Sequence, residues 1–297
     1  MLRRMVRLSR PLSLGCRLAL LSLLPSVAVS ASEPARLLVE PADALLDGRR
    51  DSAQLIASGI DGEESAYDLT RKAEWTSSDP NVVEVFPDGR VEPRGDGEAE
   101  IRARFQSHEA TAVVRVRNAG TAHRIGFVHE VLPALTKAGC NMGACHGTPT
   151  GKNGFRLSLR GYDPELDFTT LARESGGRRS NVQHPEASLV LLKGTGAAPH
   201  EGGARLREGS ELYRILGDWM AEGARRDAEG VPSLAELVVT PPSRILDAPA
   251  DEQQLVVRAR FSDGSSRDVT RLARYGVTDA SVAAVDERGK VTKVGRG

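Results

Sequence analysis

The sequence predicts a multidomain fold with an all-β sandwich at each end and a mostly α domain between them. Short apolar–polar alternations separated by turn residues run through 34–118, and the same pattern returns in 233–297. Between these segments, residues 121–228 instead carry apolar residues at helical spacing. A chain of 297 residues has room for two or three domains of ordinary size.

The N-terminal segment 1–31 has the composition of a secretory signal peptide. Four arginines precede an apolar run over 12–29, and Ala28, Ser30 and Ala31 offer a small-residue cleavage site. We therefore expect an exported protein, located in the periplasm or at the cell surface. The zero net charge of the chain gives no indication of nucleic-acid binding. No later stretch is apolar over enough residues to span a membrane.

Residues 34–118 are predicted to form the first sandwich. Alternating runs typical of short strands lie at 37–39, 53–57, 82–85, 100–105 and 112–116. Turn formers such as Asp79-Pro80-Asn81 and Gly95-Asp96-Gly97 separate them. Short strands with regular turns and no helical period are typical of an antiparallel sandwich.

The C-terminal segment 233–297 is predicted to be a second, incomplete copy of this module. Asp68-Leu69-Thr70-Arg71 recurs 200 positions later as Asp268-Val269-Thr270-Arg271. At the same offset Pro41, Leu55, Asp79, Val82, Val85, Gly89 and Val91 match Pro241, Leu255, Asp279, Val282, Val285, Gly289 and Val291. So many matches at one offset indicate a duplicated module. The second copy stops before the counterparts of the last two strands, so we expect the chain to be a fragment of a longer protein.

The middle segment 121–228 is predicted to be mostly helical. Apolar spacing indicates helices over 126–137, 167–174, 185–193 and 210–222. Pro133 predicts that the first of these is kinked or begins at the proline. The last is the strongest, because Ser210 can cap its start and Gly223 can end it.

The middle segment also carries two cysteines, Cys140 and Cys145, with His146 directly after the second. This order is what covalent haem attachment requires, because each thiol binds one vinyl group and the adjacent imidazole ligates the iron. Four residues separate the cysteines instead of the usual two, and Gly143 and Gly147 would give the longer loop its backbone freedom. A disulfide between the cysteines and a metal site shared with His146 remain open alternatives.

Several motifs of the end modules carry a family resemblance. These motifs are Asp68-Leu69-Thr70, the run from Trp75 to Val85, Gly89-Arg90-Val91 and Gly95-Asp96-Gly97. In these motifs, both end modules resemble the group 2 bacterial immunoglobulin-like domain. The resemblance implies immunoglobulin-like sandwiches of the kind that serve as spacers, adhesion modules or glycan binders.

Four motifs carry a second resemblance in the middle segment. They are Cys145-His146-Gly147, the run Gly151–Leu157, the run His184–Leu189 and the run Leu216–Ala224. Over roughly residues 125–225 they resemble the planctomycete-type cytochrome c domain. The resemblance implies a cytochrome c-like domain with one covalent haem c, attached through Cys140 and Cys145, and with His146 as the proximal iron ligand.

The distal iron ligand departs from the family pattern. Relatives carry a Met-Pro-Pro segment before the last helix, whereas this chain has Pro199-His200-Glu201 there and no methionine. His200 is therefore the candidate distal ligand, and a pair of histidines is expected to give a lower potential than a His/Met pair. Met220 and His184 are weaker candidates, and an open or water-bound site remains a further alternative.

The sequence thus predicts an exported electron-transfer module with one covalent haem between immunoglobulin-like spacers. Its partner would be a redox protein, and the end modules would make cell-surface or glycan contacts. One alternative is a structural, adhesion or glycan-binding surface protein with a Cys140–Cys145 disulfide and no haem. Another is a haem domain that serves an enzyme whose catalytic domain follows residue 297. The sequence itself shows no catalytic constellation.

Overall fold

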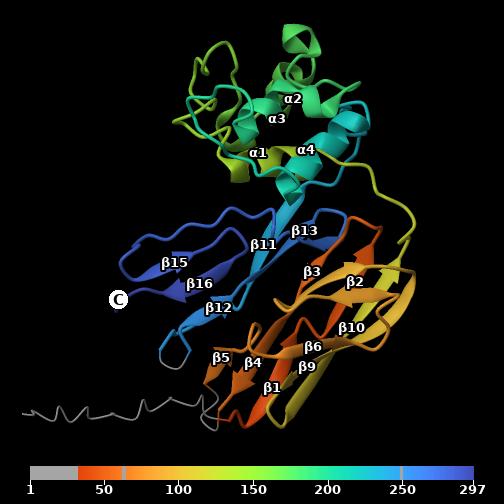
Figure 1. Cartoon of the computed structure of the whole chain (residues 1–297), viewed down its shortest axis with the longest axis vertical. Helices are drawn as coiled ribbons and strands as arrows, with labels where there is room; N and C mark the ends of the chain where they lie inside the picture. Colours follow the sequence, from red (N-terminus) through yellow and green to blue (C-terminus); the bar gives the residue numbers. More distant parts are fainter. Residues whose placement is uncertain (1–32, 62–64, 248–249) are drawn as a thin grey trace, which may run out of the picture. The chain divides into compact units, whose positions relative to one another are not determined.

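The N-terminal module is built of β-strands, drawn in red to yellow in Figure 1. Ten strands lie in its described residues, and their inward-facing side chains form one apolar core. The computed structural model describes residues 33–61, 65–247 and 250–297. The strands are β1 (Arg36–Glu40), β2 (Asp43–Asp47), β3 (Ala53–Gln54), β4 (Ile56–Ile60), β5 (Ala66–Asp68), β6 (Glu74–Ser77), β7 (Val83–Val85), β8 (Arg90–Pro93), β9 (Gly97–Phe105) and β10 (His108–Arg117). They form sheets in the orders β1-β4-β5, β2-β10-β9-β6 and β3-β8-β7.

The hairpin of β9 and β10 shows why the sequence alternates in this module. In the antiparallel register Ile101 lies opposite Ala112, and Ala99 lies opposite Val114. These four side chains are buried, whereas most of their neighbours along each strand are exposed. A two-residue alternation places one face of the sheet in the core and the other in solvent.

The C-terminal module repeats this strand pattern. Its strands are β11 (Leu234–Thr240), β12 (Glu252–Gln254), β13 (Val256–Phe261), β14 (Ser266–Asp268), β15 (Ala283–Val285) and β16 (Lys290–Lys293). The sheet orders β11-β13-β14 and β12-β16-β15 reproduce β1-β4-β5 and β3-β8-β7 of the first module. The sequence repeat is therefore also a repeat of strand pairing.

The second module differs from the first in how deeply equivalent residues are buried. Leu37 and Val39 on β1 are each 6% exposed, whereas Leu237 and Val239 on β11 are 53% and 40% exposed. In the first module, the sheet containing β9 and β10 contributes to the shared core. Among the described residues of the second module no equivalent sheet is formed, so these side chains of β11 remain open to solvent.

The two modules contact each other through equivalent residues. The carboxylate of Asp268 accepts a hydrogen bond from the backbone N–H of Gln54 (2.9 Å), and that of Asp68 accepts one from the N–H of Gln254. With its second oxygen, each aspartate accepts the N–H of the threonine two residues further along. The contact is therefore reciprocal, because each module supplies both a donor and an acceptor.

The middle of the chain contributes four short α-helices around a core of its own. They are α1 (Leu132–Ala138), α2 (Pro164–Ala172), α3 (Leu189–Thr195) and α4 (Glu211–Ala221). A π-helical turn, η1 (Phe127–Val131), leads into α1, and 3-10 turns lie at η2 (Leu159–Gly161), η3 (Glu174–Gly177) and η4 (Pro185–Ala187). The rings of Phe127, Phe168 and Trp219 fill the centre, with that of Phe127 centred 5.3 Å from Phe168 and 5.4 Å from Trp219.

The fold-class prediction is wrong for this middle segment. Sandwiches are present, but the structure is mostly β, with 30% strand against 19% helix, and no mostly α cytochrome c-like domain lies between them. The helices stop early because glycines end them. Gly139 ends α1 with a φ of 82°, and Gly196 ends α3 with a φ of 81°, a left-handed conformation that favours glycine. Turns and loops follow both helices.

The sequence predicts a signal peptide and no membrane-spanning segment after it. The predicted signal peptide, residues 1–31, lies outside the described residues. Within the part of the chain that the structure describes, no helix has the length and apolar character needed to cross a bilayer.

Candidate functional site

The cysteine–histidine segment follows α1 directly and folds back on itself. The backbone N–H of Cys140 donates to the carbonyl of Leu135 in α1 (2.9 Å), and the N–H of His146 donates to the carbonyl of Cys140 (3.0 Å). Cys140 and Cys145 are both free thiols and are partly exposed. The loop therefore keeps both sulfur-bearing residues and the histidine in one short stretch of backbone.

A close approach of the backbone at Asn141 requires a glycine at position 147. A Cβ atom at this position would lie 2.2 Å from the carbonyl oxygen of Asn141, which no side chain permits. Gly143 has no comparable constraint, because the nearest atom to its would-be Cβ is 3.9 Å away on Leu159. Of the two glycines that we expected to give the loop its freedom, only Gly147 therefore has a visible steric role.

A hydrogen bond at Nδ1 fixes the orientation of the His146 imidazole. Its Nδ1 lies 3.0 Å from the carbonyl oxygen of Phe155, and its ring packs against the Phe155 ring at 4.5 Å. Because a carbonyl only accepts, Nδ1 must carry the proton. Burial, followed by the charges of His200 and Arg179, lowers the pKa of His146. The ring is thus neutral near pH 7, with a lone pair on Nε2.

His200 is held in the same way from a different loop. Its Nδ1 lies 2.9 Å from the carbonyl oxygen of Gly203, so this nitrogen also carries a proton. The rings of His146 and His200 are centred 6.2 Å apart and are nearly parallel, with an angle of 9°. The two imidazoles therefore come close together in a stacked arrangement, although they lie on different loops.

The weaker distal candidates have other contacts. Met220 is fully buried in the core of the helical segment, and its Sδ accepts a hydrogen bond from the Oγ of Ser188 (2.8 Å). His184 is largely exposed, with Nδ1 3.5 Å from the carboxylate of Glu186. Among the described histidines, His200 places its ring next to that of His146.

These residues have the chemistry that a covalently attached haem would need. Two free thiols could attach its vinyl groups, and two imidazoles that direct Nδ1 to a carbonyl could offer Nε2 to its iron. Cys140 and Phe155 also pack against the apolar core, as a porphyrin site requires.

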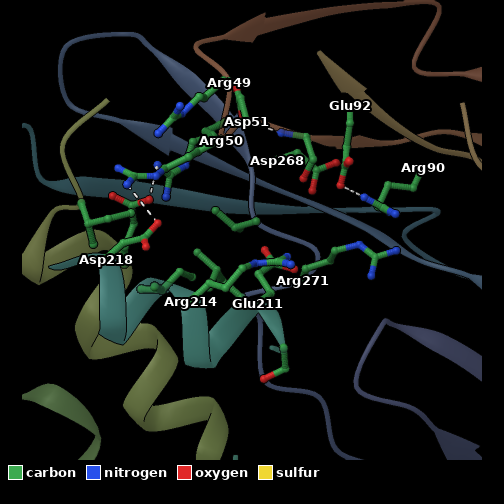
Figure 2. A pocket seen from close by; sticks show the side chains of 18 of the residues that line it. Arg49, Arg50, Asp51, Arg90, Glu92, Glu211, Arg214, Asp218, Asp268 and Arg271 are labelled. Carbon is green, nitrogen blue, oxygen red and sulfur yellow. Dashed lines mark hydrogen bonds and ion pairs between the residues drawn. The ribbon is translucent and has the colours of Figure 1, made fainter. Parts of the chain in front are cut away.

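A cleft of about 690 Å³ lies elsewhere in the molecule, lined mainly by charged side chains (Figure 2). Figure 2 shows Arg50 and Asp218 at one end, Arg90 and Glu92 at the other, and Arg214 between them. Arg50 forms an ion pair with Asp218 (2.9 Å), and Arg90 forms one with Glu92. The lining comes from both β modules and from α4, so the cleft depends on how they pack together.

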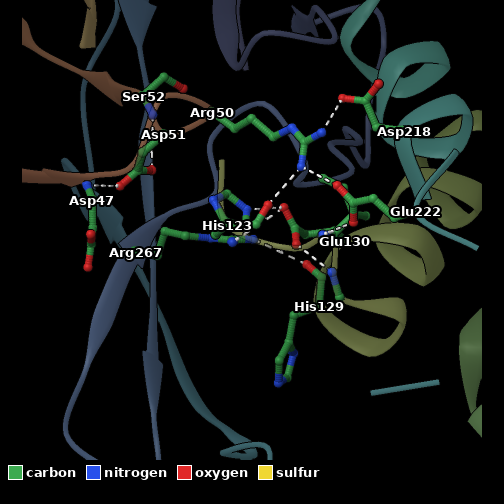
Figure 3. A network of polar contacts seen from close by, with 12 residues as sticks. Asp47, Arg50, Asp51, Ser52, His123, His129, Glu130, Asp218, Glu222 and Arg267 are labelled. Carbon is green, nitrogen blue, oxygen red and sulfur yellow. Dashed lines mark hydrogen bonds and ion pairs between the residues drawn. The ribbon is translucent and has the colours of Figure 1, made fainter. Parts of the chain in front are cut away.

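A polar network adjoins this cleft (Figure 3). Arg50, from the N-terminal module, donates to the carboxylate of Glu222 (2.6 Å) and to the carbonyl of His123 (2.7 Å). Glu222 in turn accepts the backbone N–H of Ile125 (2.9 Å). These bonds join the first module to the segment that leads into η1 and to the end of α4.

Glu130 is the buried centre of the same network. It accepts a hydrogen bond from Nε2 of His123 (2.9 Å), and its carboxylate lies 3.6 Å from Arg267 of the C-terminal module. Burial alone would raise the pKa of Glu130, but the His123 bond and the charge of Arg267 lower it overall. Glu130 is therefore ionised at neutral pH and links the helical segment to the C-terminal module.

The cleft and the network were not predicted from the sequence. Their arginines come from separate segments, so no spacing rule groups them. The one available signal was Asp268-Val269-Thr270-Arg271, which indicated the repeat and not a cleft wall.

Comparison with known proteins adds no identification. No family model matches the chain, and no curated protein matches it.

Proposed function

We propose that this chain is an exported electron-transfer module that carries one covalent haem c at Cys140, Cys145, His146 and His200. One observation carries the proposal: two nearly parallel imidazoles are centred 6.2 Å apart, and one of them, His146, directly follows Cys145 in the loop that holds both free thiols. Both rings direct Nδ1 to a backbone carbonyl, which leaves each Nε2 available as a ligand. Bound there, haem would supply one-electron oxidation and reduction at its iron.

The two thiols would attach the cofactor. The S–H of each cysteine would add across one vinyl group, forming a carbon–sulfur bond while the hydrogen goes to the other vinyl carbon. No oxidant is needed, because the addition changes no net oxidation state. The pKa of Cys140 is raised to about 11, chiefly by burial, so this thiol stays protonated at neutral pH.

The two histidines would set the electronic properties of the iron. A hydrogen bond from Nδ1 to a carbonyl fixes the ring orientation and raises the basicity of Nε2. An imidazole in place of a methionine thioether favours the oxidised iron, so the expected potential lies below that of a His/Met site.

Resemblance supports the rest of the proposal. The similarity of residues 125–225 to planctomycete-type cytochrome c domains concerns local motifs, since the overall helical fold is absent. The end modules, similar to group 2 bacterial immunoglobulin-like domains, would act as spacers with cell-surface or glycan contacts. The partner would be a redox protein, in the periplasm or at the cell surface.

The test is a haem-stained denaturing gel of the full chain made with a c-type maturation system. The wild type is expected to retain haem after denaturation, and Cys140→Ser/Cys145→Ser is expected to lose it. Met142→Ala, a change inside the same loop, serves as the matched control and should keep the stain.

A colourless but folded wild type would contradict the proposal. If that protein also lacked free thiols, the alternative of a structural or adhesion protein with a Cys140–Cys145 disulfide would replace it.

A further inference from the structure

The charged cleft of Figure 2 carries an excess of positive charge. Eight arginines and six acidic residues line its volume of about 690 Å³. That volume is within the range of about 300–1,000 Å³ that is usual for small-molecule sites. Most of the carboxylates already have partners inside the protein: Glu130 with His123, Asp218 with Arg50, Glu92 with Arg90 and Asp268 with a backbone N–H. Most of the carboxylates are therefore not free to balance the remaining arginines.

At one end of the cleft, three guanidinium groups crowd around one carboxylate. Arg271 lies 3.0 Å and Arg288 lies 3.9 Å from the same oxygen of Asp88. Arg90 stands beside them, stacked over the Phe86 ring at 3.7 Å. Because Arg90 pairs with Glu92 and Arg271 pairs with Asp88, the guanidinium of Arg288 adds a positive charge that an added anion would balance.

Arg90 itself shows the effect of this crowding. Its side chain is 19% exposed, and its Nε is buried without a hydrogen-bond partner among the described residues. Burial, and then the positive charge of Arg271, lowers the pKa of the Arg90 guanidinium. A buried guanidinium donor without an acceptor is costly, so the hydrogen-bonding capacity of Arg90 is only partly satisfied inside the protein.

Further arginines line the cleft without a protein partner. Arg207 and Arg214 are exposed and, within the described ranges, form no ion pair or side-chain hydrogen bond. Arg214 lies on α4, and Arg207 lies just before Ser210, which caps that helix. A smaller cleft of about 120 Å³ shares Arg207, Arg271 and Arg288 with the larger one, so the basic surface is continuous.

We propose that this cleft binds a small polyanion that carries at least two oxyanion groups, either phosphate or carboxylate. One group would bind at Arg90, Arg271 and Arg288, and another at Arg207 and Arg214. Guanidinium groups suit both chemistries, because their planar donors match two oxygens at once. The site is separate from Cys140 and His146 and goes beyond the proposed electron transfer.

The test is calorimetric titration of the full chain with pyrophosphate, and in parallel with citrate, at low ionic strength. Saturable binding of at least one probe is expected, and it should weaken as salt is added. Arg207→Gln/Arg214→Gln should raise the dissociation constant about tenfold or more. Both arginines are exposed and unpaired, so this variant is expected to fold normally.

A matched control separates the site from general charge. Arg36→Gln/Arg225→Gln removes the same charge from exposed positions outside the cleft and should change the dissociation constant less than about twofold. The preferred probe then assigns the ligand to phosphates or to carboxylates. Absence of saturable binding with both probes would overturn the proposal, and so would equal losses in the two double variants.

Discussion

At the scale of single residues, Arg179 holds the loop that supports His146. Its guanidinium is buried, donates to the carbonyl of Gly154 (2.6 Å) and to a carbonyl of α2 (2.7 Å), and stacks over the Phe155 ring at 4.8 Å. Phe155 in turn supplies the carbonyl that orients His146. Arg179→Leu leaves these carbonyls without a donor, so the free energy of unfolding should fall by about 3 kcal/mol in urea titration.

The neighbouring arginine provides the control for that change. Arg178 is exposed and has no side-chain hydrogen bond among the described residues. Arg178→Leu should change the stability by less than about 0.5 kcal/mol. Equal losses in the two variants would show that Arg179 has no special structural role.

Glu130 makes stability depend on pH. Its folded pKa is lowered, so its ionised form stabilises the fold above the unfolded pKa of about 4.5, and this contribution is lost as pH falls through the folded value. Glu130→Gln should therefore cost about 2 kcal/mol at pH 7 and weaken the acid-induced loss of stability. Thermal unfolding measured between pH 3 and pH 7 tests this. The exposed Glu98→Gln should leave the pH profile unchanged.

At the scale of elements, a distant carboxylate holds the start of the η1–α1 helix. Asp227 accepts hydrogen bonds from the backbone N–H groups of Phe127 (2.7 Å) and Val128 (2.8 Å), which have no partner within the helix. Asp227→Ala should lower the free energy of unfolding by about 2 kcal/mol. Urea denaturation measures this, with the exposed Glu229→Ala as control. A loss no larger than that of the control would contradict the capping role.

Helix positions could be predicted from the sequence more reliably than the fold they build. The expected helix over 210–222 appears as α4, and the helix expected over 126–137 changes from η1 to α1 at Leu132, next to Pro133. Apolar spacing and capping are local signals, so they locate an element. They do not give the length of the loops that follow Gly139 and Gly196, and those loops exclude a mostly α domain.

At the scale of the whole molecule, the repeat docks on itself through Asp68 and Asp268. Each carboxylate uses both oxygens to accept backbone N–H groups. Asp68→Asn and Asp268→Asn would each turn an NH₂ group toward a backbone N–H. Both should therefore lower the unfolding free energy by similar amounts of about 2 kcal/mol. The exposed Asp43→Asn is the control in thermal unfolding. A large loss in only one variant would contradict a reciprocal contact.

The sequence reveals the repeat but not this contact. An offset of identical residue types identifies two copies of a module, because identity is visible along the chain. The packing of the two copies decides which backbone N–H donates to Asp268. The spacing of residues along the sequence does not contain this information. The same limit applies to His146 and His200, which come from different loops and are paired only in three dimensions.

The most direct test of the proposed haem site is the visible absorption spectrum of the haem-loaded full chain, oxidised and reduced. The wild type should show a six-coordinate, low-spin iron with two histidine ligands. His200→Ala should change it to a high-spin spectrum while the haem remains covalently bound, and His184→Ala, at an exposed histidine, should leave it unchanged. A His200→Ala spectrum identical to that of the wild type would contradict the His146–His200 pair as the iron ligands.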